Sequence, residues 1–245
     1  MKLLFMGRKR SAAEALRWTL GQGVDVVAVV TDHEVATSPT AKVAREHDKP
    51  LLSLEDVTVG IERGDLDFEL AVSFVYWRVL KEPVLSFPKY GIINFHPAPL
   101  PDFKGTAGYN LAILEALDSW AVTAHYIDKG VDTGPIIERF EFSIDPEEET
   151  AVTIERKRQA FMVSLYKKVL RKALRHGLLP TVPNEGGRYI SRKAMEAMKR
   201  VEPGDDVDRK IRAFWFPPYT GAYVVIDGKK YTLVNEAILQ GLPQA

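Results

Sequence analysis

The residues best suited to chemistry in this chain are an asparagine and a histidine at the end of an apolar run, in the stretch GIINFHP (residues 91–97). Side chains along an extended strand alternate between its two faces, so Asn94 and His96 project to the same side. Pro97 ends the strand because it has no N–H to donate and its φ is fixed. An amide beside an imidazole suits acyl chemistry, in which the amide donates to a developing oxyanion and the imidazole moves a proton.

A carboxylate follows downstream, on the glycine-flanked loop DKGVDTG (residues 128–134). Either stretch alone fits an ordinary buried strand end or an unrelated turn, but the two in this order, with a strand between them, favour one site. Together they resemble the formyltransferase family that uses N10-formyltetrahydrofolate. In that family the Asn and His of Asn-x-His-Pro and the Asp of Asp-Thr-Gly are the catalytic set. The resemblance implies catalytic roles for Asn94, His96 and Asp132.

The apolar pattern predicts the elements that must bring these residues together. Strands are expected at residues 2–6, 24–30, 50–53, 67–73, 121–127 and 135–144, besides the one that begins at Ile92. Helices are expected at residues 11–20, 40–47, 54–62, 108–117 and 150–175. Strands alternating with helices predict an α/β fold with a doubly wound, mostly parallel, Rossmann-like sheet. Ligands of such sheets bind beyond the carboxyl ends of the strands.

One further histidine and the longest helix are expected to have structural roles. His125 shares a strand face with Thr123 and Ile127, and a lone strand histidine is more often structural, so we leave it out of the catalytic set. The helix at residues 150–175 carries apolar residues at helical spacing, and we expect it to pack on the sheet.

An aromatic and apolar segment directly follows the strand expected at residues 67–73. The aromatic rings of this segment could simply pack against the hydrophobic core. In formyltransferases, however, the corresponding loop lines the pterin pocket, largely through its backbone. The resemblance implies N10-formyltetrahydrofolate as formyl donor, no metal, and folate contacts at Phe74, Val75, Tyr76, Trp77, Arg78, Val79, Leu80, Ile92, Asp128 and Gly130.

Basic residues fill the turn between the first strand and the first helix, where Arg8, Lys9 and Arg10 lie. Cations beside a helix N-terminus can hold a phosphate, although a solvated charge run is an equally good interpretation. No dinucleotide fingerprint is present, since Gly21-Gln22-Gly23 precedes a strand instead of following one. Further contacts with an acceptor are predicted at Lys104, Gly105, Tyr109, Asn110, Trp215, Phe216 and Tyr219.

The bulk composition excludes several classes of function. Lys and Arg total 33, as do Asp and Glu, so no net field attracts the chain to nucleic acid or to a membrane. There is no cysteine, hence neither a disulfide nor a thiolate metal site, and no apolar run is long enough for a signal peptide or a membrane span. We expect a cytoplasmic protein.

Residues 177–188 contain proline and glycine and mark the expected boundary between a catalytic domain (1–180) and a small C-terminal subdomain (181–245). The subdomain is expected to hold one helix, at residues 206–213, and then the aromatic segment FWFPPYTGAY. A hairpin of residues 223–226 and 230–234 is expected to follow, around the favoured turn Asp227-Gly228.

The tail IRAF…PPYTGAY resembles that of sugar N-formyltransferases. Methionyl-tRNA formyltransferases usually carry instead a barrel domain that binds RNA and is larger than the C-terminal part of this chain. The resemblance implies a homodimer that binds no nucleic acid and acts on a nucleotide-linked amino sugar, of the type dTDP-4-amino-4,6-dideoxyhexose, for O-antigen or other surface-glycan synthesis. Three alternatives stay open: a methionyl-tRNA formyltransferase-like enzyme, a formyltetrahydrofolate hydrolase, and a folate- or nucleotide-binding protein without activity.

Overall fold

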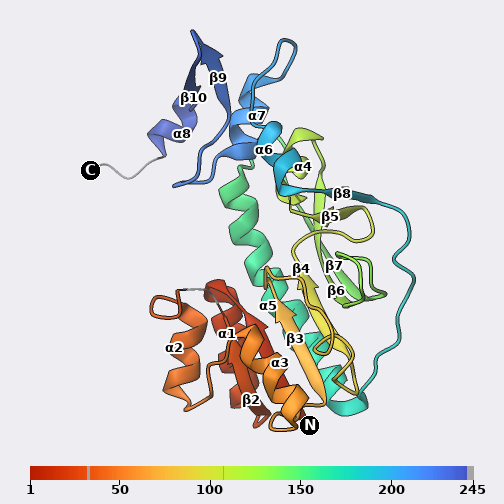
Figure 1. Cartoon of the computed structure of the whole chain (residues 1–245). Helices are drawn as coiled ribbons and strands as arrows, with labels where there is room; N and C mark the ends of the chain where they lie inside the picture. The colour runs from red at the N-terminus through yellow and green to blue at the C-terminus, as the bar shows by residue number, and fades with distance from the viewer. Residues whose placement is uncertain (32–33, 107, 242–245) are drawn as a thin grey trace.

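The computed structural model describes residues 1–31, 34–106 and 108–241. Its centre is a six-stranded sheet in the order β2-β1-β3-β4-β6-β7 (Figure 1). The strands are β1 (Lys2–Gly7), β2 (Asp25–Val30), β3 (Leu70–Phe74), β4 (Ile92–His96), β6 (Ser119–Tyr126) and β7 (Ile136–Ser143). The first four pair in parallel, while β6 is antiparallel to both β4 and β7. The mostly parallel α/β sheet predicted from the sequence is confirmed.

Helices cover both faces of the sheet because its central strands are apolar on both sides. In β1, Leu3 and Phe5 belong to one buried cluster, while Leu4 and Met6 belong to another on the opposite face. The first cluster is completed by α1 (Lys9–Gly21), α2 (Pro39–Glu46), α4 (Gly108–Leu114) and α5 (Ala151–His176), and the second by α3 (Leu54–Arg63). Such burial on both faces is typical of parallel sheets.

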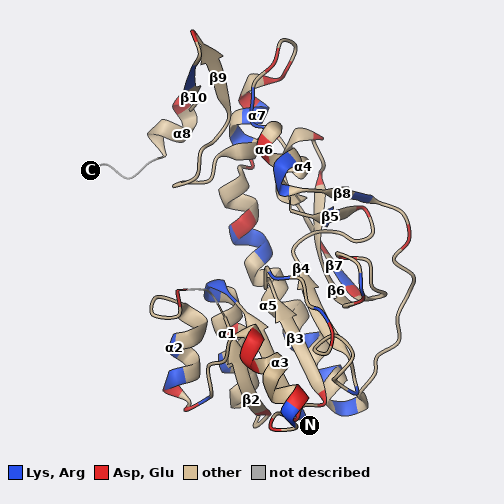
Figure 2. Cartoon of the chain, viewed as in Figure 1, with Lys and Arg blue, Asp and Glu red and all other residues tan. Residues whose placement is uncertain are grey.

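The long helix α5 links the sheet to the C-terminal part of the chain (Figure 1). Thr150 caps its start by accepting a hydrogen bond from the Thr153 N–H, and Tyr166 packs under the sheet with its ring centre 5.0 Å from that of Phe95. Figure 2 shows that α5 also carries bands of acidic and basic residues. The helix α5 is long but too polar to cross a membrane. Among the described residues, no other helix is long and apolar enough to do so.

The expected elements differ from the observed ones where a pattern is short. The strand expected at residues 50–53 is a single bridge between Val29 and Leu51. The expectation of one helix after residue 188 is wrong, because α6 (Arg192–Ala197) and α8 (Glu236–Gln240) accompany α7 (Val207–Phe214). Helices of one or two turns have no apolar stripe long enough to show in the sequence. Also unforeseen is the two-stranded sheet of β5 (Phe103–Gly105) and β8 (Arg188–Ile190), whose partners are far apart in the chain.

The C-terminal hairpin of β9 (Tyr223–Ile226) and β10 (Lys229–Thr232) forms as predicted. Asp227 and Gly228 both have positive φ, which is the requirement of the favoured two-residue turn. The hairpin leaves Val225, Ile226 and Tyr231 exposed at the end of the molecule away from the N-terminus (Figure 1). The homodimer and the domain boundary at residue 180 stay predictions.

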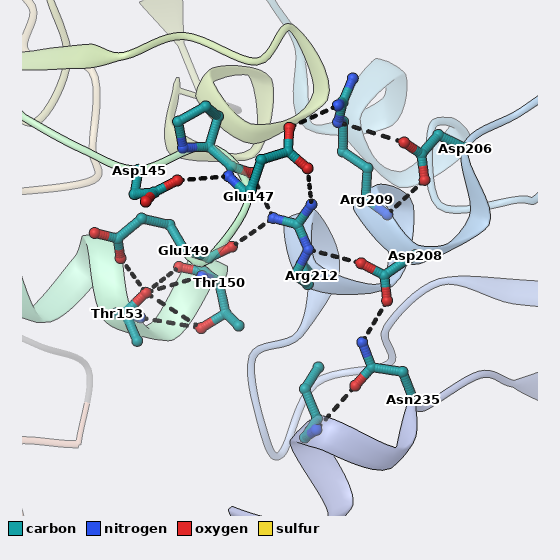
Figure 3. A network of polar contacts seen from close by, with 12 residues as sticks. Asp145, Glu147, Glu149, Thr150, Thr153, Asp206, Asp208, Arg209, Arg212 and Asn235 are labelled. Atoms are coloured by element: carbon teal, nitrogen blue, oxygen red, sulfur yellow. Dashed lines mark hydrogen bonds and ion pairs between the residues drawn. The ribbon is translucent and has the colours of Figure 1, made fainter.

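A polar network fixes α7 to the start of α5 (Figure 3). The buried guanidinium of Arg212 donates to the carbonyl oxygens of Pro146 (2.6 Å) and Glu149 (3.1 Å). Arg209 forms an ion pair with Glu147 at 2.9 Å. Since these bonds hold α7 in place, they also fix the aromatic segment that directly follows it.

Candidate active site

A cavity of about 850 Å³ opens at the carboxyl ends of β1, β3 and β4, the edge of the sheet that the alternation of strands and helices predicted. Most of the predicted site residues line it. They are Arg8, Lys9, Val75, Tyr76, Trp77, Arg78, Val79, Leu80, Asn94, His96, Gly105, Tyr109, Asn110, Asp128, Gly130, Asp132, Phe216 and Tyr219.

Asn94 is oriented by His125, which lies directly opposite it on the antiparallel strand β6. His125 Nδ1 lies 2.7 Å from the carbonyl oxygen of Tyr126, and Nε2 lies 3.0 Å from Asn94 Nδ2. A carbonyl only accepts, so Nδ1 carries the proton and Nε2 accepts from the Asn94 amide. An amide nitrogen has two N–H groups, so one remains for a ligand oxygen. The expectation that His125 is merely structural is corrected: it positions Asn94 within the site.

His96 has an acceptor on each ring nitrogen. Nε2 lies 2.9 Å from the carbonyl oxygen of Phe103, and Nδ1 lies 3.4 Å from a carboxylate oxygen of Asp132. Burial lowers the pKa of His96, while the Asp132 charge opposes that effect. The neutral ring donates through Nε2 and keeps its lone pair on Nδ1, whereas the protonated ring satisfies both acceptors. The surroundings can therefore stabilise a proton that reaches Nδ1.

Asp132 comes from a separate loop, yet its carboxylate lies between the two histidines. Burial alone would raise the pKa of Asp132, but the charge of His96 and a hydrogen bond from the Gly105 N–H (2.9 Å) hold it at about 2. His125 Nε2 is 3.7 Å from the same oxygen that faces His96. Asp132 is therefore a fixed negative charge at any ordinary pH.

The loop that carries Asp132 is held by its own residues and by the segment after α5. The Asp128 carboxylate accepts from the Gly130 N–H (3.0 Å) and from the Thr133 hydroxyl (2.6 Å). Asn184 donates to the carbonyl oxygens of Asp132 (2.9 Å) and Gly134 (2.8 Å). A Cβ at Gly134 would lie 1.9 Å from a backbone oxygen of β6, which explains the glycine in Asp-Thr-Gly.

Backbone strain marks the opposite wall of the cavity. Val75, directly after β3, has a φ of 54°, which is rare for a β-branched residue and persists only where the surroundings enforce it. The segment after it presents Trp77 and Val79 to solvent at the cavity wall. Arg78 is engaged by Glu55 through two hydrogen bonds, and these hold the pKa of Glu55 at about 2. This wall can hold a flat apolar ring against backbone groups.

Five predicted contacts do not reach the cavity. Phe74 and Ile92 point into the apolar clusters on the two faces of the sheet. Arg10 is exposed on α1, outside the lining. Lys104 donates to the carbonyl oxygen of Gly186 (2.8 Å) and so joins β5 to the segment before β8. Trp215 packs in the small C-terminal cluster instead.

Two groups of polar residues in the lining, all charged except Gln159, were missed. Glu155, Arg158 and Gln159 come from α5, and Arg192, Glu196 and Lys199 come from α6 and its end. The charged residues Glu155 and Arg158 continue the buried stripe of α5 at helical spacing. The charges on the otherwise apolar stripe of α5 could have indicated this part of the site. The sequence offered no comparable pattern for α6, because a helix this short does not show an apolar stripe.

Comparison with known proteins identifies the family of the chain and similar folds. Residues 3–170 match the family model described as "Formyl transferase". The methionyl-tRNA formyltransferase of Caldanaerobacter subterraneus subsp. tengcongensis is 29% identical over 255 aligned residues, which cover 98% of this chain and 82% of that protein. A 4-N formyltransferase from Francisella tularensis has a similar fold, with a TM-score of 0.80 at 20% identity, covering 96% of this chain and 97% of that one.

A second similar structure contains ligands. The N-formyltransferase from Helicobacter canadensis, in complex with folinic acid and dTDP-3-aminofucose, has a TM-score of 0.76 at 22% identity and covers 94% of this chain and 86% of that one.

Proposed function

Because the chain belongs to the formyl transferase family, we propose that it moves a formyl group from N10-formyltetrahydrofolate to the amine of a nucleotide-linked amino sugar. The observation that carries the proposal is the meeting of Asn94, His96 and Asp132. Their two segments are distant in sequence, yet one carboxylate oxygen lies 3.4 Å from His96 Nδ1, on the face that Asn94 shares. An oxyanion donor, a base and a charged partner are the groups that acyl transfer needs.

In the proposed reaction the amine attacks the formyl carbon and the carbonyl oxygen gains negative charge. The free N–H of Asn94 donates to that oxygen, and the bond to His125 keeps the amide aimed at it. His96 takes the amine proton on Nδ1, directly or through water, and Asp132 offsets the resulting charge. The carbon–nitrogen bond to the folate then breaks and N10 receives the proton from His96, directly or through water, so tetrahydrofolate leaves, the base is regenerated and no covalent intermediate with the protein is needed.

The site also suits a small acceptor. Its volume lies within the usual range for small-molecule pockets, roughly 300–1,000 Å³. The ring of Phe216 stacks on that of Tyr109 (centres 6.3 Å apart, 22° between planes), and Tyr219 follows at 5.9 Å. This aromatic wall, made of Tyr109, Phe216 and Tyr219, offers faces on which a nucleobase could stack. The lining has six Lys or Arg and four Asp or Glu, which favours an anionic acceptor.

The test is tetrahydrofolate formation with a panel of nucleotide-linked amino sugars, with charged initiator tRNA, and with no acceptor. We expect turnover with an amino sugar only. The methionyl-tRNA formyltransferase relative makes the tRNA arm the main alternative, and turnover there would replace the proposal. Equal formate release without any acceptor would identify a hydrolase instead.

Tyr219→Ala is expected to weaken nucleotide-sugar binding by about fivefold, since an aromatic contact contributes about 1 kcal/mol. Tyr219 is 63% exposed, so its removal should not lower the melting temperature. Separate titrations with the sugar nucleotide and with folinic acid provide the measurement. Tyr231→Ala, an exposed hairpin tyrosine outside the cavity, is the control. A mutant that melts early but binds the sugar normally would place this residue in the core instead.

Asp132→Asn is expected to lower activity and move the acidic limb of kcat/KM to lower pH. Asp132 raises the pKa of His96, so without the carboxylate that pKa falls further and the base stays unprotonated to lower pH. A weaker base costs about tenfold in rate at most for each unit of pKa lost. Asp102→Asn, whose carboxylate faces Arg139 outside the cavity, is the control. An unmoved acidic limb would show that Asp132 does not act on His96.

A further inference from the structure

Lys9, Glu155 and Arg158 form a charged corner in the wall of the cavity. Lys9 Nζ lies 3.0 Å from Glu155 Oε1, and an Arg158 Nη2–Glu155 Oε2 ion pair closes the other side. The side chains of Glu155 and Arg158 are 5% and 3% exposed, and that of Lys9 is 34% exposed. One carboxylate is thus shared between two cations that are distant in sequence, one at the start of α1 and one on α5.

The corner has more positive charge than its own residues neutralise. A buried charge is costly unless it is paired and hydrogen-bonded. Glu155 compensates one of the two cations, and Arg158 Nε, although buried, has no hydrogen-bond partner among the described residues. Lys9 is in addition held at a φ of 71°, an unusual conformation for a lysine. These features are those of a site that is completed by an anion.

The corner lies beside both the reacting groups and the aromatic wall. The Arg158 guanidinium carbon is 5.7 Å from the centre of the Tyr109 ring, which stacks in turn on Phe216. Burial, followed by the charge of Glu155, raises the pKa of Tyr109 to about 12, so its hydroxyl stays a donor. Arg158 and the proposed base His96 line the same cavity.

We propose that Arg158 and Lys9 bind a phosphoryl group of the acceptor, with Glu155 holding the two cations in place. The inference rests on the proposed function. It restricts the acceptors to molecules whose diphosphate can lie between the aromatic wall and His96. A guanidinium presents several N–H donors in one plane and so matches a phosphoryl group better than an ammonium does. The site is distinct from the exposed cations: Arg10 lies outside the cavity and Arg78 is engaged by Glu55.

The test is calorimetric titration of the full chain with dTDP, thymidine and folinic acid. Arg158→Met is expected to weaken dTDP binding by about 10–150-fold, the loss of a hydrogen bond to a charged group, and to leave folinic acid binding unchanged. Arg158→Lys should recover only part of the loss, because it restores charge without the planar donors. Arg156→Met, an exposed arginine on the same helix, is the control and should bind dTDP as the wild type does.

Removing Arg158 alone leaves Glu155 buried without its closest partner, so two further variants cover a failure to fold. The double variant Glu155→Gln/Arg158→Gln keeps the corner's net charge but removes the guanidinium. Lys9→Met changes a partly exposed side chain. Loss of dTDP affinity in either folded variant supports the site. Wild-type dTDP affinity in both overturns it, and weakened folinic acid binding alone would assign the corner to a folate carboxylate instead.

Activity measurements separate this inference from the proposed function. If dTDP binding depends on Arg158 but no nucleotide-linked amino sugar is formylated, the anion site stands and the proposed function fails. If amino sugars are formylated with the same KM by wild type and by Arg158→Met, the proposed function stands and the anion site fails.

Discussion

Replacing His96 with glutamine is expected to lower turnover by about 10²–10⁴-fold, the usual contribution of a positioned acid–base group. Glutamine can still donate to the Phe103 carbonyl oxygen, which now lies 2.9 Å from His96 Nε2, so the fold should survive. It has no titratable nitrogen, however, and cannot take the amine proton beside Asp132. Single-turnover formation of tetrahydrofolate at saturating acceptor measures the chemical step directly.

The matched control is His47→Gln, because His47 is exposed just after α2 and does not line the cavity. It should react at the wild-type rate. A His96→Gln enzyme that keeps near-normal turnover, with an unchanged pH profile, would show that the proton leaves by another route. A loss of folinic acid binding in place of turnover would make His96 a folate contact.

Substituting Asn94 with alanine is expected to reduce kcat by about 10²–10³-fold, as removal of one oxyanion donor does in other acyl-transfer sites. The reason is that the free amide N–H of Asn94, aimed by the bond to His125 at 3.0 Å, meets negative charge that exists only in the transition state. Folate and acceptor affinities should change little. Asn94→Asp, which keeps the shape but removes the donor, should lose at least as much.

Steady-state kinetics combined with folinic acid titration distinguish the two possible roles of Asn94. An Asn94→Ala enzyme with wild-type kcat and a weaker folate affinity would contradict the oxyanion role. Asn235→Ala serves as the control for removing an amide, since Asn235 caps α8 in the C-terminal part of the chain. That variant can lower stability but should leave kcat unchanged.

Much of the fold followed from local patterns. Apolar runs and capping residues are properties of neighbouring residues, so most strands and long helices lie where the sequence placed them. The Asn94–His96 pair is similarly local: two residues on one strand share a face whatever the rest of the chain does. The roles of Pro97 and Gly134 are also local. Pro97 ends a strand, and Gly134 allows two backbone segments to approach closely because it has no Cβ.

Only the tertiary structure decided which distant groups share the site. His125 faces Asn94 because β6 pairs antiparallel with β4 in one particular register, and register between strands is not written in either strand alone. The same holds for Asp132, whose loop is fixed by Asn184 from the segment after α5.

The charged corner shows that the sequence of a helix also does not determine which distant residues its buried face contacts. The spacing along α5 places Glu155 and Arg158 on its buried stripe, but the sequence does not say whether that stripe meets apolar side chains or a cavity. Packing against α1 and α4 brings the stripe to Lys9 and Tyr109. The sequence by itself thus determined the chemical groups and their local geometry, while their partners depended on long-range packing, which joins segments that no local pattern connects.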